Sequence, residues 1–265
     1  MAGRKGTPGP GSLVVVGTGI TVAGQATLES VDRMQRAEKL FYLVTDPATA
    51  SWLHRLNPTA TTLDDLYAPG KSRIRTYVEM SDRIVAAVRA GQNVCAAFYG
   101  HPGVFVAASH HAIRRLRHAG YPARMLPGVS AEDCLFADLG VNPGNVGCQS
   151  VEATDFLAAR RRFDPTSELI LWQVGVMGEA SVRKGVSCRP ARLQKLTDTL
   201  RHYYPARHPV VLYEASGFPG CEPMVKRTTL AKLPTEKVLS MTTLYVPPKP
   251  PRADDPRIMA WFDEP

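Results

Sequence analysis

The sequence predicts an α/β fold of two domains, and three features support that prediction. Apolar, β-branched segments at 13–16 and 93–99 each run into a glycine turn, as buried strands of a parallel sheet do. An amphipathic helical pattern follows each of them, which is the alternation of an α/β sheet with right-handed crossovers. After the Pro-Gly pair at 127–128 the expected strands lie closer together, with fewer helices between them. We therefore expect a second αβ domain that contains a mixed or antiparallel sheet.

The expected elements of the first half alternate in type, and the helix at 73–90 illustrates why. It carries apolar residues at Tyr77, Met80 and Ile84 on one face, and Gly91 caps its end. In chain order we expect a strand at 13–16, a helix at 27–39, a strand at 40–44, a helix at 48–56, a long connection at 57–71, a helix at 73–90, a strand at 93–99, a helix ending near 118 and a strand at 123–126. A connection as long as this one is often functional.

The second half is organised differently and suggests where the domains divide. We expect a helix at 131–140, strands at 147–153, 168–174, 209–214 and 237–246, and a long helix at 190–204. The domain limits that follow are a flexible leader at 1–11, an N-terminal αβ domain at 12–126, a C-terminal αβ domain at 127–246 and a Pro-rich tail at 247–265. The Pro-Gly pair is the expected hinge, and a ligand cleft would open there.

Composition excludes several classes of protein. The 265 residues include 32 Lys+Arg and 24 Asp+Glu, so the net charge is 32 − 24 = +8, and 44% of the residues are hydrophobic. This is ordinary globular usage, and no apolar run reaches the length of about 18 residues that a membrane span requires. The five cysteines are widely spaced and form no C-x-x-C, so we expect neither disulfides nor a metal site. The N-terminus lacks an apolar signal region, and we expect a cytoplasmic protein without a membrane partner.

Two motifs that often mark a cofactor or metal are incomplete here. The turn Gly17-Thr18-Gly19 has the first two glycines of a dinucleotide fingerprint but Val22 in place of the third. The adjacent histidines at 110–111 cannot face one ion together, since neighbouring helical residues point in different directions. Neither motif predicts a nicotinamide, flavin or metal protein.

A sharper group of residues combines one arginine with three tyrosines: Tyr67, Arg73, Tyr77 and Tyr99. Arg73 and Tyr77 are four residues apart, so they share a helix face, and Tyr99 follows a buried strand, where α/β folds bind ligands. A guanidinium within about 4–6 Å favours a phenolate and lowers the pKa of a phenol from about 10. These residues are therefore a candidate base assembly. The alternative is that Tyr77 belongs to the core and Arg73 to a solvated face.

Two further loops are candidates for ligand contact. The segment at 99–106 joins a strand to a helix through Gly-His-Pro-Gly, a rigid loop that brings backbone close to a ligand, although it is equally consistent with an ordinary βα turn. The segment at 127–133 lies at the expected hinge. There Ser130 could instead cap the following helix, with Asp133 completing a capping box.

Together these segments resemble a known enzyme family. The order of the three clusters over roughly residues 12–246 is similar to the tetrapyrrole-methylase superfamily. More narrowly, Leu-Tyr-Ala-Pro-Gly-Lys-Ser-Arg at 66–73, followed by Tyr77 and by Phe-Tyr-Gly-His-Pro-Gly-Val-Phe-Val at 98–106, resembles the borosin peptide backbone α-N-methyltransferases. The superfamily usually has Gly-Asp-Pro where this chain has Gly-His-Pro. Asp64 is a departure, since borosin enzymes often have tyrosine there.

The resemblance implies a donor, a site and a partner. The donor would be S-adenosylmethionine, with S-adenosylhomocysteine as product, bound without metal in the cleft between two αβ domains of a homodimer. Carried over by position, the catalytic residues are Tyr67, Arg73, Tyr77 and Tyr99. The donor-binding residues carried over are His101, Val104, Phe105, Ser130, Ala131, Gln173, Ala215, Thr242 and Thr243.

The resemblance also implies N-methylation of backbone amides in a ribosomally made peptide. Fused borosin enzymes carry a Val/Ile/Gly-rich substrate at their own C-terminus, and the last residues here differ from it. We therefore expect a split form that acts on a separate precursor peptide in trans, as a homodimer or as a heterotetramer with two precursor chains. Three alternatives stay open: methylation of a tetrapyrrole or other small molecule, a basic RNA-binding methylase, and a peptide-binding relative without catalysis. The RNA alternative rests on the +8 charge and the basic runs at 114–118 and 160–162.

Overall fold

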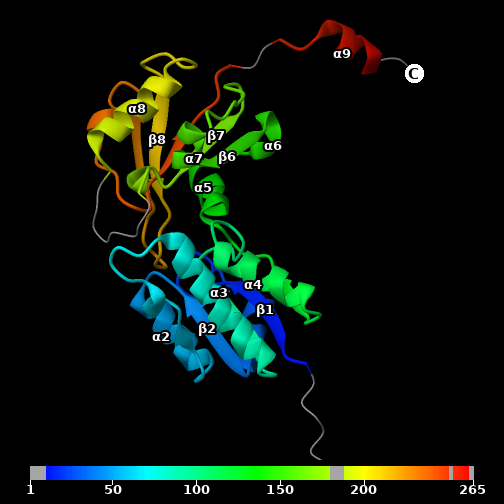
Figure 1. Ribbon diagram of the computed structural model, residues 1–265. Coiled ribbons are helices and arrows are strands. Elements are labelled where there is room, and N and C mark those ends of the chain that lie inside the picture. The colour runs from blue at the N-terminus through cyan, green and yellow to red at the C-terminus, as the bar shows by residue number, and fades with distance from the viewer. Residues whose placement is uncertain (1–9, 180–187, 251–252, 263–265) are drawn as a thin grey trace, which may run out of the picture. The chain divides into compact units, whose positions relative to one another are not determined.

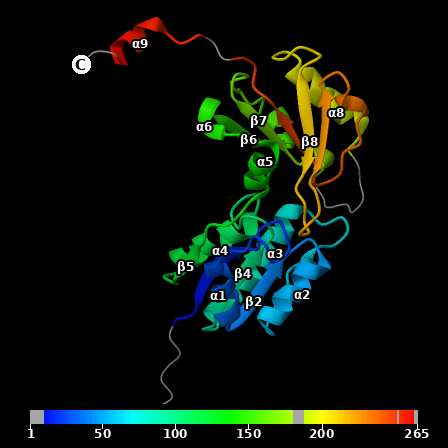
Figure 2. The ribbon, with the colours of Figure 1, turned by 180° about the vertical axis from the view of Figure 1, so that it is seen from behind.

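The structure of this chain is a computed structural model that describes residues 10–179, 188–250 and 253–262. These residues form two compact units, and each is considered by itself (Figures 1 and 2). The first unit contains the chain up to Leu139 together with Ala215–Glu222, and the second contains most of the remainder. Residues 1–9 of the expected leader lie outside the described residues, as do 251–252 and 263–265 of the expected tail.

The first unit is built on a parallel sheet in the strand order β3-β2-β4-β1-β5. Its strands are β1 (Ser12–Gly17), β2 (Lys39–Leu43), β3 (Thr61–Thr62), β4 (Asn93–Phe98) and β5 (Ala123–Met125). Each neighbouring pair runs parallel, which confirms the predicted α/β architecture of this half. The connection expected at 57–71 contains the two-residue strand β3 and the 3₁₀ turn η1 (Asp64–Leu66).

Helices cover both faces of this sheet. They are α1 (Leu28–Arg36), α2 (Pro47–Leu56), α3 (Arg73–Arg89) and α4 (Ala107–His118), and α5 (Ala131–Leu139) follows. Because side chains alternate along a strand, Leu13 and Val15 of β1 pack under α3 and α4, whereas Val16 packs under α1 and α2. Figures 1 and 2 show α3 and α4 side by side.

The second unit is built on a mixed sheet in the order β6-β7-β10-β8-β9. Its strands are β6 (Cys148–Glu152), β7 (Glu168–Trp172), β8 (Pro209–Glu214), β9 (Met224–Thr229) and β10 (Thr243–Val246). Strands β6 and β7 are parallel and the other pairs are antiparallel, which confirms the predicted mixed sheet. The strand expected at 237–246 forms only in its last four residues. Strand β9 is an addition that the sequence did not predict, since its Lys-Arg-Thr-Thr segment has little hydrophobic signal.

Short helices complete the second unit. They are α6 (Pro143–Val146), α7 (Ala153–Ala158), α8 (Pro190–Leu200) and α9 (Pro256–Phe262), with the 3₁₀ turns η2 (Val174–Val176) and η3 (Leu233–Thr235). Helices α7 and α8 pack on the sheet face that carries Leu169, Leu171 and Leu244. The first residues of the expected tail also pack here, because the Lys249 N–H donates to the carbonyl of Pro165 at 2.8 Å.

The chain divides after α5, and not at the Pro-Gly pair of 127–128 where we expected a hinge. Helix α5 contacts the first unit, because the Gln25 side-chain amide donates to the sulfur of Cys134 at 3.4 Å. The segment Ala215–Glu222 also belongs there, since Thr21 Oγ1 donates to the carbonyl of Ser216 at 3.1 Å. Long-range contacts of this kind are not visible in local sequence patterns.

No helix in the described part of the chain is long and apolar enough to cross a membrane.

Gly175 is a position at which adding a single methyl group should destabilise the second unit. A Cβ built there would lie 1.7 Å from the carbonyl oxygen of Leu239, which is backbone and cannot move aside. We predict that Gly175→Ala lowers the free energy of unfolding by about 2–3 kcal/mol. The control is Gly217→Ala, where an added Cβ meets nothing within 4 Å. Denaturant unfolding of the two variants should separate them, and equal stability would contradict the close contact.

Candidate active site

The candidate site lies at the carboxyl edge of the first sheet. Ligands of open α/β sheets bind at that edge, where the loops after parallel strands meet. A Cβ on Gly17, at the end of β1, would lie 2.2 Å from the carbonyl oxygen of Gly100 and 2.9 Å from Cδ of Pro102. The Gly100 N–H in turn donates to the carbonyl of Gly19 at 2.9 Å. The loops after β1 and β4 thus meet backbone to backbone, and only glycine fits at position 17.

Three of the four predicted catalytic residues gather where η1 leads into α3. Tyr67 and Tyr77 are half-buried against the core under α3, and their side chains are hydrogen-bonded to each other. The charge of Arg73 acts on the Tyr67 phenol. Nε of Arg73 is buried and has no hydrogen-bond partner among the described residues. An unpaired buried donor of this kind costs free energy and is suited to a ligand oxygen.

The ionisation of the tyrosines differs from what the spacing suggests. Burial is the main cause that raises the pKa of Tyr67 well above its usual value, and the hydrogen bond with Tyr77 raises it further. Arg73 lowers that pKa, as expected, but it is the weakest of the causes. Burial also raises the pKa of Tyr99 to about 12. At Tyr67, desolvation therefore outweighs the positive charge of Arg73, and a protonated phenol is favoured there.

Tyr99 has a different electrostatic environment from Tyr67, Arg73 and Tyr77. It follows β4, and its N–H donates to the carbonyl of Leu43 at 3.0 Å. After burial, the ionisable neighbours that raise its pKa are Cys134 and Asp46, and Arg73 is not among the causes. The structure thus assembles Tyr67, Arg73 and Tyr77 but gives Tyr99 a different environment.

Two ion pairs from α3 hold the Tyr67 loop in place. Lys71 Nζ donates to the carbonyl of Leu66 at 2.6 Å and pairs with Glu79. Arg83 forms a two-pronged pair with Asp65, at 2.7 and 2.9 Å. Sequence reasoning missed these residues, although a signal exists: α3 carries charges at 75, 79 and 83, a spacing of four that places them on one face.

The predicted donor-binding loop after β4 is partly exposed and strained. The Gly103 N–H donates to Nδ1 of His101 at 3.0 Å, so the ring proton of a neutral imidazole is on Nε2, where it can be donated. Val104 and Phe105 are 39% and 49% exposed, which leaves an apolar surface beside the loop. Phe105 has a φ of 57°, and such a left-handed conformation in a bulky residue is typical of functional loops.

The predicted hinge residues act as a helix cap. Ser130 Oγ accepts hydrogen bonds from the N–H groups of Glu132 and Asp133, at 3.2 and 3.3 Å, and donates to the Asp133 carboxylate at 2.6 Å. This confirms the capping box, and it commits the Ser130 hydroxyl to α5. Ala131 is the first residue of that helix. Ala215 follows β8 and begins the segment that belongs to the first unit.

The remaining predicted residues meet at one edge of the second sheet. Gln173 follows β7 with a φ of 58°, and the N–H of the next residue, Val174, donates to the carbonyl of Thr242 at 3.2 Å. Thr242 Oγ1 accepts from the Leu239 N–H at 2.7 Å and donates to the Glu214 carboxylate. Thr243 begins β10. Gln173, Thr242 and Thr243 are therefore brought together, and Glu214 is a neighbour that sequence reasoning missed.

The part of the chain that the structure describes contains no group of three or more His, Cys, Asp or Glu side chains arranged to hold a metal ion.

Comparison with known proteins matches the chain over most of its length. Residues 12–234 match the family model described as Tetrapyrrole (Corrin/Porphyrin) Methylases. A protein of Gymnopus fusipes, named as a methyltransferase and ribosomally synthesized precursor of the cyclic gymnopeptides, is 44% identical over 90% of this chain and 58% of its own length. The corresponding methyltransferase and omphalotin A precursor of Omphalotus olearius is 44% identical over 92% of this chain and 60% of its own. This chain thus spans about three fifths of these curated relatives.

Solved structures show the same fold at lower identity. A uroporphyrin-III-C-methyltransferase from Thermus thermophilus superposes with a TM-score of 0.64 at 21% identity, over 90% of this chain and 92% of that one. A conserved hypothetical protein from Aeropyrum pernix K1 gives a TM-score of 0.68 at 21% identity, over 91% and 86%. At this identity the likeness establishes the fold, which confirms the predicted fold class.

The two ion pairs that involve Asp65 and Glu79 should limit the opening of the Tyr67 loop. In the double variant Asp65→Asn, Glu79→Gln, the Arg83 and Lys71 pairs lose their charge, so the loop opens more often. We expect the amides of residues 63–67 to exchange hydrogen about two- to tenfold faster. Asp32→Asn is the control, since it breaks the Arg36 pair on α1. Exchange mass spectrometry reads both variants, and unchanged exchange at 63–67 in the double variant would show that the pairs do not hold the loop.

Proposed function

The chain belongs to the tetrapyrrole methylase family, and we propose that it transfers the methyl group of S-adenosylmethionine to backbone amide nitrogens of a peptide. Membership rests on the family match over residues 12–234, and this family uses S-adenosylmethionine as donor. The choice of substrate is supported by relatives at 44% identity whose names join a methyltransferase to a ribosomally synthesized peptide precursor. The structural observation that carries it is the half-buried Tyr67, Tyr77 and Arg73 group, with its buried and unpaired arginine donor.

An amide nitrogen needs help before it can attack a methyl group. Its lone pair is delocalised into the carbonyl, which makes the peptide bond planar and the nitrogen a poor nucleophile. Loss of the N–H proton gives an imidate, in which negative charge collects on the carbonyl oxygen. A site for this reaction must therefore stabilise that oxygen and accept the proton.

We assign the carbonyl oxygen to Arg73 and Tyr67. The buried Arg73 Nε is a donor without a partner among the described residues, and burial keeps the Tyr67 phenol protonated and able to donate. Two preorganised donors at a developing oxyanion follow the logic of an oxyanion hole. This assignment makes the raised pKa of Tyr67 useful, because a phenolate could not donate.

We assign the amide proton to the phenolate oxygen of Tyr77, directly or through a water, so that taking up the proton leaves a neutral phenol. Tyr77 lies one helical turn after Arg73 and contacts Tyr67, so one amide could meet all three side chains. Tyr99, at the end of β4, is assigned to orienting the substrate as a neutral hydroxyl. When bound, the donor supplies a sulfonium methyl: the nitrogen–carbon bond forms as the carbon–sulfur bond breaks, and the bond pair stays on sulfur.

Donor-binding residues are proposed in each unit, considered by itself. Support comes from the close backbone contact at Gly17 and from the left-handed conformations of Phe105 and Gln173. The exposed Val104 and Phe105 offer apolar surface for the adenine or methionine portion. The proposed donor-binding residues are His101, Val104, Phe105, Ser130, Ala131 and Ala215 in the first unit and Gln173, Thr242 and Thr243 in the second. Ser130 would contribute backbone, because its hydroxyl caps α5.

We extend the proposal to a precursor supplied as a separate chain to a cytoplasmic homodimer, or to a heterotetramer with two precursor chains. The named relatives carry their precursor in the same polypeptide, so this step has its own test. Light scattering of the 265-residue chain with and without a Val/Ile/Gly-rich peptide measures both stoichiometries. A monomer under both conditions would contradict it.

Arg73 should be required for methyl transfer. The chain is incubated with S-adenosylmethionine and the Val/Ile/Gly-rich peptide, and tandem mass spectrometry locates each added methyl group. We expect Arg73→Lys to lower kcat about 10²–10³-fold, the usual effect of removing an oxyanion donor. Arg55→Lys, at an exposed position on α2, is the matched control. Methyl transfer at the normal rate by Arg73→Lys would overturn the assignment, and methyl groups on side chains only would overturn the substrate class.

The pH dependence of the reaction should reflect buried, protonated tyrosines. Because burial raises the pKa of Tyr99 to about 12 and that of Tyr67 well above its usual value, both hydroxyls stay protonated at neutral pH. We therefore predict that neither contributes an inflection to kcat/KM between about pH 7 and about pH 10. The profiles of Tyr67→Phe and Tyr99→Phe are compared with that of the unmodified chain. An inflection in this range that disappears in either variant would show that the phenol ionises during the reaction.

A further inference from the structure

Helix α4 carries basic side chains along its whole exposed face. Its sequence, Ala-Ala-Ser-His-His-Ala-Ile-Arg-Arg-Leu-Arg-His, contains no acidic residue, and Ala108, Ala112 and Leu116 are buried. At about 3.6 residues per turn, the polar side chains other than the buried serine fall on the opposite side. We call this exposed set the basic stripe: His110, His111, Arg114, Arg115, Arg117 and His118.

Much of the charge on the basic stripe is not neutralised within the described residues. Arg115 pairs with Asp82 at 2.5 Å, and Nε of Arg117 donates to the carbonyl of Ala123 at 2.7 Å. None of the ion pairs formed between described residues includes Arg114 or Arg117. Like charges three or four residues apart destabilise a helix by about 0.2–0.5 kcal/mol per pair. The basic stripe thus costs stability, and a partner of opposite charge would account for it.

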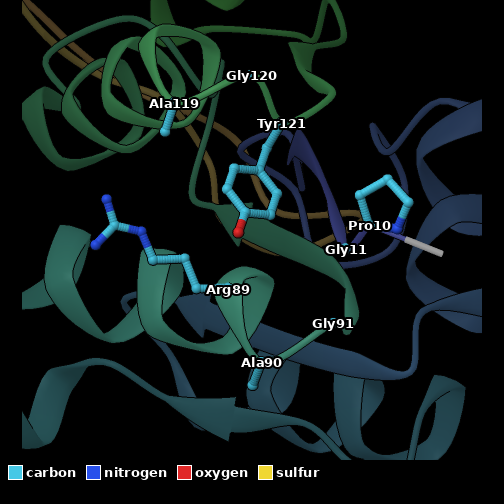
Figure 3. A pocket seen from close by; sticks show the side chains of 8 residues that line it. All are labelled: Pro10, Gly11, Arg89, Ala90, Gly91, Ala119, Gly120 and Tyr121. Atoms are coloured by element: carbon cyan, nitrogen blue, oxygen red, sulfur yellow. The ribbon is translucent and has the colours of Figure 1, made fainter. Parts of the chain in front are cut away.

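One end of the basic stripe leads to a pocket at the amino edge of the first sheet. The pocket has a volume of about 400 Å³ and is lined by the ends of α3 and α4 and by the residues that precede β1 and β5. Figure 3 shows Arg89, from the end of α3, and Tyr121, which follows α4, on two sides of it. Arg89 is exposed and belongs to none of the ion pairs of the described chain. The pocket therefore combines a free cation with an aromatic wall.

The other end of the basic stripe contacts the candidate active site. The ring of His110 is hydrogen-bonded through Nε2 to the carbonyl of Gly103, at 2.8 Å, in the loop that also carries His101. The stripe therefore connects the amino edge of the sheet to its carboxyl edge. Helix α4 has 12 residues, so its length is about 18 Å, which an extended peptide crosses in about five or six residues.

From this arrangement we propose that the basic stripe and the pocket are a docking track for an acidic recognition segment of the peptide substrate. This inference rests on the proposed function and names how the substrate is recognised. Carboxylates of the segment would pair with Arg89, Arg114 and Arg117, and one side chain would enter the pocket beside Tyr121. The chain beyond the segment would then reach the loop that contains His101, so the first methylated amide would lie at a fixed number of residues past the docked segment.

The arrangement favours a peptide over a nucleic acid. The basic stripe is one helix wide, and its exposed face carries no Phe, Tyr or Trp on which bases could stack. The carboxylates of an extended acidic peptide complement the arginines of the basic stripe in charge, and the pocket is large enough for a single side chain. A single-stranded RNA is accordingly the competing ligand in the test.

The test measures binding without methyl transfer. The probe is a fluorescein-labelled peptide of alternating glutamate and alanine, and its anisotropy is followed at low salt as the 265-residue chain is added. A peptide of alternating glutamine and alanine and an oligouridine of equal charge are the comparisons. The variant is Arg89→Gln, Arg114→Gln. Its control, Arg162→Gln, Arg207→Gln, removes the same charge from exposed positions in the second unit.

We expect the glutamate peptide to bind, the glutamine peptide not to bind, and the Arg89 and Arg114 double variant to bind about three- to tenfold more weakly. Equal weakening in the control, or tighter binding of oligouridine than of the glutamate peptide, would overturn the proposal. The binding assay contains no S-adenosylmethionine, so its result does not depend on whether the chain transfers methyl groups. Conversely, a peptide that fails to bind here does not alter the methyl-transfer test of the proposed function. In the methyl-transfer assay, moving the acidic segment along a Val-rich peptide should move the position of the first methyl group with it. A methyl position that stays fixed would contradict the docking track.

Discussion

Burial of the Tyr67 phenol against Tyr77 is the constraint on which the chemistry of the site depends. Removal from water disfavours a phenolate more strongly than the nearby guanidinium of Arg73 favours it, so the hydroxyl keeps its proton. Nε of Arg73 is itself buried and has no hydrogen-bond partner in the described structure. A site with two such donors is prepared for negative charge on a substrate oxygen, and an imidate develops that charge. This relation joins the packing of the first unit to the methyl transfer that we propose.

Helix α3 carries residues of the candidate active site, of the ion pairs to the Tyr67 loop and of the pocket at the opposite edge of the sheet. Its first turns carry Arg73 and Tyr77, its middle carries Glu79 and Arg83, which hold the Tyr67 loop, and its last residue, Arg89, lines the pocket at the opposite edge of the sheet. The ion pairs are partly exposed and individually weak, yet they fix a loop whose position determines where Tyr67 donates. A helix beside a parallel sheet thus connects the proposed substrate recognition at one edge to the proposed chemistry at the other.

Much of the fold could be predicted from the sequence, because buried parallel strands and amphipathic helices leave periodic patterns. The strand at 93–99 and the helix at 73–90 lie within a residue of β4 and α3. Strand β9 could not be found this way, since an exposed strand has little apolar signal, and the division after α5 depends on the contact between Gln25 and Cys134. Within the site, the spacing of Arg73 and Tyr77 predicted that both lie one turn apart on a helix, and both are on α3. It could not show that burial would dominate the pKa of Tyr67, because burial is a property of the folded chain.

The central claim is that Tyr67 remains protonated in the folded chain, and direct titration tests it. Carbon-13 labelling of the tyrosine rings lets nuclear magnetic resonance follow each phenol, and Tyr67→Phe assigns the resonance of Tyr67. The structure predicts that this resonance does not shift below about pH 10, the ordinary pKa of a phenol. A Tyr67 resonance that titrates near neutral pH would show that Arg73 outweighs burial, and it would contradict the role of Tyr67 as a neutral donor.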